Sequence, residues 1–133
     1  MTTVGPELRT IAATAFRALN SGDLEAYLSV IAEDVEFTSM IAEMEGVTFR
    51  GHQGVRDWWE TVRGAFQDVQ WELLELRECG PGAVAQLRAT GALGGAEVDQ
   101  TVWQAATFRD GKLTWWEFFR SEQEAREAIR ATR

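Results

Sequence analysis

The sequence predicts a single α+β domain in which helices pack on one face of a curved antiparallel sheet. Apolar residues recur at helical spacing in the first half of the 133-residue chain, and long strand-like stretches separated by turn signals fill most of the second half. Helices followed by a run of antiparallel strands form the α+β plan. The length suits one domain, so we expect residues 1–133 to fold as one unit.

Four helices are predicted from apolar spacing and from end signals. Pro6 suits the first turn of a helix, and Leu8 and Ile11 lie on one face of it. A helix stop, a turn and a new N-cap then follow one another in the sequence Asn-Ser-Gly-Asp, after which a short helix begins. Near the C-terminus, Ser121 and Glu124 form a capping box. The expected helices cover residues 6–20, 24–31, 55–66 and 121–133.

Strands are predicted where the period changes from helical to alternating. Val35 and Phe37 alternate with polar residues, which indicates the first strand. Later strands end at Gly-Pro-Gly, at Gly-Gly and at Arg-Asp-Gly-Lys, which contains the Asp-Gly pair typical of hairpins. Residues 41–46 are expected to form a loop. The expected strands cover residues 35–39, 47–50, 69–79, 83–93, 97–108 and 113–120.

Composition argues against several classes of partner. The formal net charge is −8, and the basic residues are scattered, whereas nucleic acids and anionic membranes require clustered Lys and Arg. No stretch approaches the roughly 20 apolar residues of a membrane helix, and the N-terminus lacks the pattern of a signal peptide. We therefore expect a cytoplasmic protein that binds neither nucleic acid nor membrane.

No cofactor or metal is expected either. The chain has one histidine, His52, and one cysteine, Cys79, which cannot make a zinc site. No glycine loop of the phosphate-binding type precedes a helix. A lone cysteine allows no internal disulfide, and no helix start, histidine or lysine near Cys79 in the sequence indicates an activated thiolate.

Four segments carry a family resemblance: FRALNSGDL at 16–24, AEDVEF at 32–37, GHQGVRDWW at 51–59 and FRDGKL at 108–113. In this order they resemble the motifs of SnoaL-like proteins, which belong to the nuclear-transport-factor-2-like superfamily together with ketosteroid isomerase and polyketide cyclase relatives. The resemblance implies a cone-shaped half-barrel. In it a curved antiparallel sheet wraps around three helices from the N-terminal half, a short helix ends the chain, and a deep cavity lies between sheet and helices.

Strand parity assigns side chains to the two faces of this sheet. By similarity to the family, the even-numbered residues of the last two strands should face the cavity. Aromatic walls with a few hydrogen-bonding groups are typical of a small-molecule pocket. The candidate ligand-binding residues are Phe37, Ser39, Trp59, Gln100, Gln104, Trp116 and Phe118.

The odd-numbered residues should then lie on the outer face of the sheet. Trp103, Trp115 and Phe119 would form an aromatic patch there, and such a patch suggests an interface. The family often dimerises through this face, so a homodimer is expected. The alternative is that the terminal helix or the N-terminus covers the patch.

The residues that catalyse the ketosteroid isomerase reaction are largely missing. By resemblance, Ser39 falls at the position of the base, Ala15 at that of the tyrosine, and Gln104 at that of the protonated aspartate. Gln104 can still donate a hydrogen bond, but a serine hydroxyl cannot abstract a carbon-bound proton unaided. The epoxide-hydrolase branch is disfavoured too, because no inward aspartate pairs with Arg88 or Arg120. Isomerase activity by this route is therefore not expected.

Three interpretations of the function stay open. The first is a domain that binds a small, mostly apolar or aromatic molecule. The second is a polyketide-cyclase or isomerase-type enzyme whose acid or base is not yet placed, with Glu43, Glu45, Asp99 and His52 as candidates. The third is a non-catalytic structural dimer whose cavity is filled by side chains.

Overall fold

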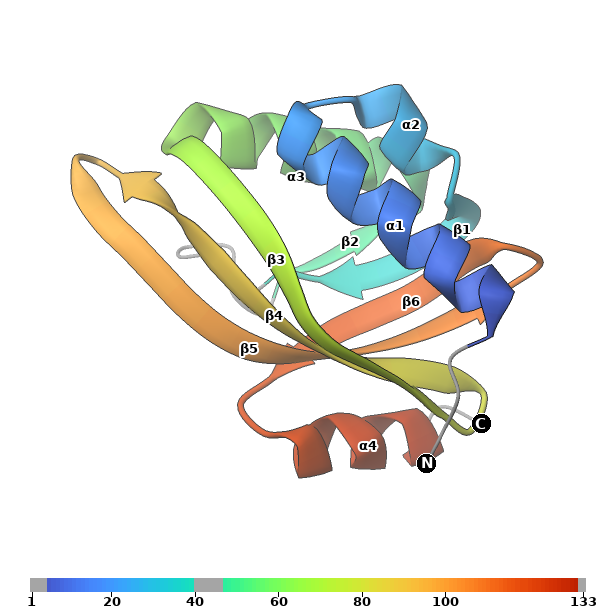
Figure 1. The fold of residues 1–133 in the computed structure, drawn as a ribbon. Helices are drawn as coiled ribbons and strands as arrows, with labels where there is room; N and C mark the ends of the chain where they lie inside the picture. Colours follow the sequence, from blue (N-terminus) through green and yellow to red (C-terminus); the bar gives the residue numbers. More distant parts are fainter. Residues whose placement is uncertain (1–4, 40–46, 132–133) are drawn as a thin grey trace.

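The predicted α+β fold is confirmed by a computed structural model, which describes residues 5–39 and 47–131, with only the backbone of residues 65–67. Figure 1 shows a strongly curved sheet with α1, α2 and α3 on one side and α4 on the other. In chain order the elements are α1 (Pro6–Ser21), α2 (Leu24–Leu28), β1 (Ile31–Thr38), β2 (Thr48–Arg50), α3 (Gly51–Ala65), β3 (Phe66–Cys79), β4 (Gly82–Leu93), β5 (Ala96–Arg109), β6 (Lys112–Phe119) and α4 (Glu122–Ala131).

The six strands of the described chain form one sheet in the order β2-β1-β6-β5-β4-β3. Strands β3 to β6 are an antiparallel meander, and β2 pairs antiparallel with β1 at the edge. The sheet is not wholly antiparallel as predicted, because β1 and β6 are parallel, with Phe37 opposite Trp116. Helix α3 carries the chain from β2 to β3 at the opposite edge of the sheet. The meander from β3 to β6 then crosses the sheet back to β1, and β6 runs parallel to β1.

The boundary between α2 and β1 also differs from the prediction. Helix α2 ends at Leu28, and Ile31, which was expected in the helix, pairs with Leu113 in the sheet. Ile31 is fully buried there. An apolar residue at helical spacing can satisfy its burial in either element, and a β-branched side chain packs well on a pleated sheet.

The main core lies between the concave face of the sheet and the helices α1 to α3. Phe37 stands at its centre, 1% exposed, with its ring stacked on Trp116 at a centroid distance of 4.5 Å. Trp58 meets the same ring edge-on, with 6.0 Å between the centroids. Offset and edge-on aromatic pairs of this kind add to the gain from burial itself.

The C-terminal end of α1 is fixed to the edge strand β3. Asn20 Nδ2 donates to the carbonyl oxygen of Trp71 at 2.9 Å, and the Trp71 amide donates to Asn20 Oδ1 at 2.7 Å. The Arg63 guanidinium donates to the Leu19 carbonyl at 2.6 Å, and Gly22 ends the helix in the left-handed conformation with φ 76°. These contacts hold α1 across the concave face.

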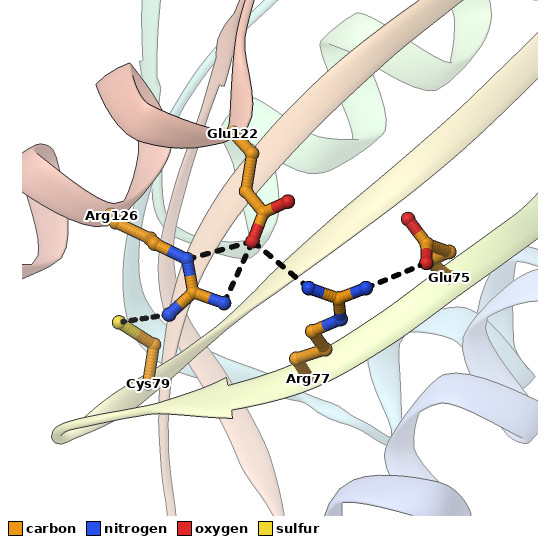
Figure 2. A network of polar contacts seen from close by, with 5 residues as sticks. All are labelled: Glu75, Arg77, Cys79, Glu122 and Arg126. Atoms are coloured by element: carbon orange, nitrogen blue, oxygen red, sulfur yellow. Dashed lines mark hydrogen bonds and ion pairs between the residues drawn. The ribbon is translucent and has the colours of Figure 1, made fainter. Parts of the chain in front are cut away.

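Helix α4 lies on the convex face. Its buried residues Ala125 and Ile129 pack on Val84 and Ala105. Figure 2 shows the polar contacts at the start of α4: Glu122 accepts from Arg77 of β3 at 3.2 Å and from Arg126 of the same helix at 2.8 Å. In the same network Arg77 reaches Glu75 at 2.8 Å, and Arg126 donates to the Cys79 sulfur at 3.8 Å.

Trp103, Trp115 and Phe119 pack against this convex cluster and are half-buried there. They therefore lie on the outer face, and α4 covers part of that face. None of the described helices is long and apolar enough to cross a membrane.

Candidate functional site

A pocket lies between α1 and the concave face of the sheet, and its volume is about 70 Å³. The lining is almost wholly apolar, and none of the described residues that form it is charged. Its walls are Leu8, Ile11, Ala12, Ala15, Phe16 and Leu19 of α1, together with Tyr27, Trp58, Trp71, Leu76, Ala83, Ala85, Leu87, Gln104, Ala106, Leu113, Trp116 and Phe118.

Alanines create this space. Ala83 and Ala85 of β4 and Ala106 of β5 line it from the sheet, and Ala12 and Ala15 line it from α1. Larger apolar residues at these positions would fill the gap between helix and sheet, as protein interiors are normally filled. The small side chains instead leave room between the aromatic rings.

Three of the residues predicted from strand parity line the pocket: Gln104, Trp116 and Phe118. The register explains why they lie together. Gln104 is directly opposite Phe118, and Ala106 is opposite Trp116, so these four side chains share the concave face.

The other four predicted residues lie outside the lining. Phe37 belongs to the core behind Trp116. Trp59 packs against the Tyr27 ring and beneath the Arg63 guanidinium, which is 4.8 Å from its centroid. Gln100 is exposed, opposite Ala89 in the sheet.

Ser39, the fourth, is buried and accepts a hydrogen bond from the indole nitrogen of Trp58 at 3.2 Å. This bond occupies the polar atom of Trp58. The serine therefore acts on the pocket indirectly, through a tryptophan that lines it.

Tyr27 is a polar lining residue that the sequence analysis did not name as a candidate. It is 5% exposed, and its ring packs against Trp59 at 5.5 Å and edge-on to Trp116 at 6.4 Å. Burial raises the pKa of its hydroxyl above the ordinary value, so the group stays protonated at neutral pH and can donate a hydrogen bond. In the sequence, Tyr27 is one of the apolar residues of a short helix, so nothing there indicated a place in the pocket lining.

Asp99 and His52, two of the candidate acids and bases, are engaged away from the pocket. Asp99 receives two hydrogen bonds from Arg88, at 2.9 and 2.7 Å, on the convex face. Those hydrogen bonds hold the pKa of the Asp99 carboxyl below its ordinary value. His52 Nε2 donates to the Ile31 carbonyl at 2.8 Å and ties α3 to β1.

Glu43 and Glu45 lie outside the described residues. Across residues 5–39 and 47–131, no group of three or more His, Cys, Asp or Glu side chains could hold a metal ion.

A curved sheet wrapped over three helices, with an apolar pocket between them, defines a cone-shaped α+β domain. The chain belongs to the SnoaL-like domain family, whose model matches residues 12–116. This confirms the resemblance carried by the four sequence segments. No curated protein matches the chain.

Solved structures share the fold. An NTF2-like protein from Burkholderia pseudomallei has a TM-score of 0.77 at 19% identity, over 95% of this chain and 97% of that one. TerC, co-crystallized with polyporic acid, has a TM-score of 0.75 at 23% identity, over 95% of this chain and 99% of that one. A candidate polyketide cyclase from Sinorhizobium meliloti has a TM-score of 0.68 at 22% identity, over 86% of this chain and 100% of that one. Identities this low establish likeness of fold alone.

Proposed function

We propose that this SnoaL-like domain binds a small, mostly apolar or aromatic molecule in the pocket between α1 and the sheet. The supporting observation is the lining itself: uncharged among the described residues, walled by aromatic rings, and carrying few polar groups. Ligand sites for small organic molecules have this composition. TerC, which has the same fold, was co-crystallized with polyporic acid, an observation in keeping with a ligand held by such a fold.

The enzymatic alternative has less support. A cyclase- or isomerase-type reaction needs an acid or base within reach of the substrate. The described lining residues include no carboxylate and no imidazole, and the Tyr27 hydroxyl stays protonated. Of the acids and bases considered from the sequence, Glu43 and Glu45, which lie outside the described residues, remain as candidates. The alternative of a cavity filled by side chains is disfavoured by the open volume beside α1.

The test is a pocket-filling substitution with a matched control on the next residue. Ala12 lines the pocket from α1, whereas Ala13 is exposed on the same helix. Ala12→Leu places three more carbon atoms in the pocket, and Ala13→Leu places them in solvent. Both suit a helix.

Binding of single-ring and fused-ring compounds is measured by tryptophan fluorescence, since Trp58, Trp71 and Trp116 line the pocket, and by thermal shift. A ligand at 100 times its Kd stabilises the fold by about 2.7 kcal/mol. We expect Ala12→Leu to abolish this shift and Ala13→Leu to preserve it. Equal binding by both variants would place the ligand elsewhere.

We further propose that the chain forms a homodimer through the part of the convex face that α4 leaves open. Support comes from Trp103, Trp115 and Phe119, which are only half-buried beside α4. The cytoplasmic location and the lack of nucleic-acid and membrane partners stay predictions from composition.

A further inference from the structure

Two polar side chains of the pocket form no hydrogen bond with any described residue. They are the Tyr27 hydroxyl and the Gln104 side-chain amide. Every fully buried side-chain nitrogen or oxygen of the described residues does have a partner. A polar atom without a partner therefore keeps access to open space, and both of these residues line the pocket.

Both polar side chains of the lining can donate a hydrogen bond. The Tyr27 hydroxyl is protonated, because burial raises its pKa. Gln104 offers both amide hydrogens and one carbonyl oxygen. An acceptor atom of a bound molecule can therefore receive hydrogen bonds from both side chains.

The same lining disfavours a charged molecule. No described lining residue carries a charge that could pair with a carboxylate or an ammonium group. Burying an unpaired charge in apolar surroundings costs far more free energy than burying a neutral polar group. A neutral acceptor can be compensated by the donors already in place.

The size of the space limits the ligand further. Its volume of about 70 Å³ is far below the roughly 300–1,000 Å³ that is typical of drug-sized ligand sites. Trp59 and Trp116 also pack against the Tyr27 ring, which limits how far this wall can retreat. A single ring suits this space better than a fused polycycle.

We propose that the pocket selects an uncharged, single-ring molecule bearing a carbonyl-type oxygen, which accepts hydrogen bonds from the Tyr27 hydroxyl and the Gln104 amide. The proposal rests on the proposed function and specifies the chemistry of its ligand. Tyr27 and Gln104 are then specificity-determining residues: the apolar walls bind the ring, and these two side chains select among rings by the polar atom that each ring carries.

Three probes of one shape test it on the full chain. Cyclohexanone carries the acceptor, methylenecyclohexane replaces its oxygen by a CH₂ group, and the cyclohexylammonium ion carries a charge. Dissociation constants come from NMR titration of the ¹⁵N-labelled protein, in which the indole N–H signals report on the pocket. We expect cyclohexanone to bind about five- to tenfold more tightly than methylenecyclohexane, and cyclohexylammonium not to bind.

Substitutions assign the preference to its residues. Tyr27→Phe keeps the buried ring and removes only the hydroxyl, so it should abolish the preference for cyclohexanone while the affinity for methylenecyclohexane stays within about twofold. Gln104→Leu should weaken the preference as well. Gln86→Leu, on the opposite face of the sheet beside Trp103, is the matched control and should retain it.

The outcomes separate this inference from the proposed function. If both neutral rings bind equally, or if Tyr27→Phe keeps the preference, the pocket binds ligands but the assignment of Tyr27 is wrong. Binding of cyclohexylammonium as tight as that of cyclohexanone overturns the inference in the same way. If neither neutral ring binds to the unaltered chain, the proposed function fails and this inference fails with it.

Discussion

Asn20 shows how one side chain can join two elements that are far apart in the sequence. Its amide group makes both hydrogen bonds that a neighbouring strand would make to residue 71, one to the N–H and one to the carbonyl. Helix α1 thereby covers one position on the open edge of β3 and is held where it forms a wall of the pocket.

Asn20→Ala should lower the free energy of unfolding by about 1–3 kcal/mol, because it leaves the two backbone groups of Trp71 without partners. Asn20→Asp should also destabilise, since it keeps an acceptor for the Trp71 amide but sets a carboxylate oxygen against the Trp71 carbonyl. Urea denaturation measures both. Ser21→Ala, at the exposed neighbouring position, is the control, and a loss of equal size there would refute the role of Asn20.

For individual residues, the sequence predicted part of the pocket lining. Strand parity, with the family resemblance to choose the inward face, identified Gln104, Trp116 and Phe118, and the β5–β6 register places these three on one face where they line the pocket. It did not identify Tyr27, whose position depends on how α2 packs against the sheet. It also included Gln100, since periodicity gives the face of a strand but not where along that face a cavity ends.

At the scale of elements, the meander depends on a close approach at the start of β4. Gly82 lies opposite Thr107, and a Cβ atom at Gly82 would overlap the carbonyl oxygen of Ala106. The clash is with backbone, which cannot rotate away as a side chain could. The sequence marked this glycine only as part of a turn.

Gly82→Ala should therefore lower the free energy of unfolding by about 1–3 kcal/mol or more, through strain between β4 and β5. Gly64→Ala is the matched control, because Gly64 lies in α3 and a Cβ atom there would meet nothing within 4 Å. Removing a helical glycine should stabilise by about 0.5–1 kcal/mol. Thermal and urea unfolding give both values, and a neutral Gly82→Ala would show that the strands can separate to admit the methyl group.

Element boundaries and strand direction were the weaker part of the sequence prediction. The existence and the order of the elements followed from apolar period and turn signals. The parallel pairing of β1 with β6 did not, because no local pattern records which strand a distant strand will meet. The same holds for the end of α2, where Ile31 joins the sheet.

For the whole molecule, the open question is what covers the convex face. Helix α4 covers part of it, and the proposed homodimer would cover the aromatic remainder. Because the net charge of −8 makes two copies repel each other, association should strengthen as salt screens that repulsion.

Light scattering coupled to size-exclusion chromatography should show a dimer whose population rises with protein and salt concentration. Trp103→Arg should yield a monomer with unchanged far-ultraviolet circular dichroism, because it places a cation within the proposed interface. Leu74→Arg changes an exposed apolar residue of β3 and should leave the dimer intact. A wild-type chain that stays monomeric at every concentration would overturn the dimer proposal and leave α4 as the cover of this face.

The parallel pair of β1 and β6 has a consequence for synthesis on the ribosome. Strands β1 and β2 are made early, yet they join the sheet only through β6, as in the pairing of Ile31 with Leu113. A two-stranded ribbon is only marginally stable by itself in water. This ribbon, with its apolar residues, can therefore join the sheet only after nearly the whole chain has been translated. Contacts so distant in sequence also slow the search for the native pairing. The apolar residues of β1 therefore become part of the complete sheet only when β6, the last strand, has been made.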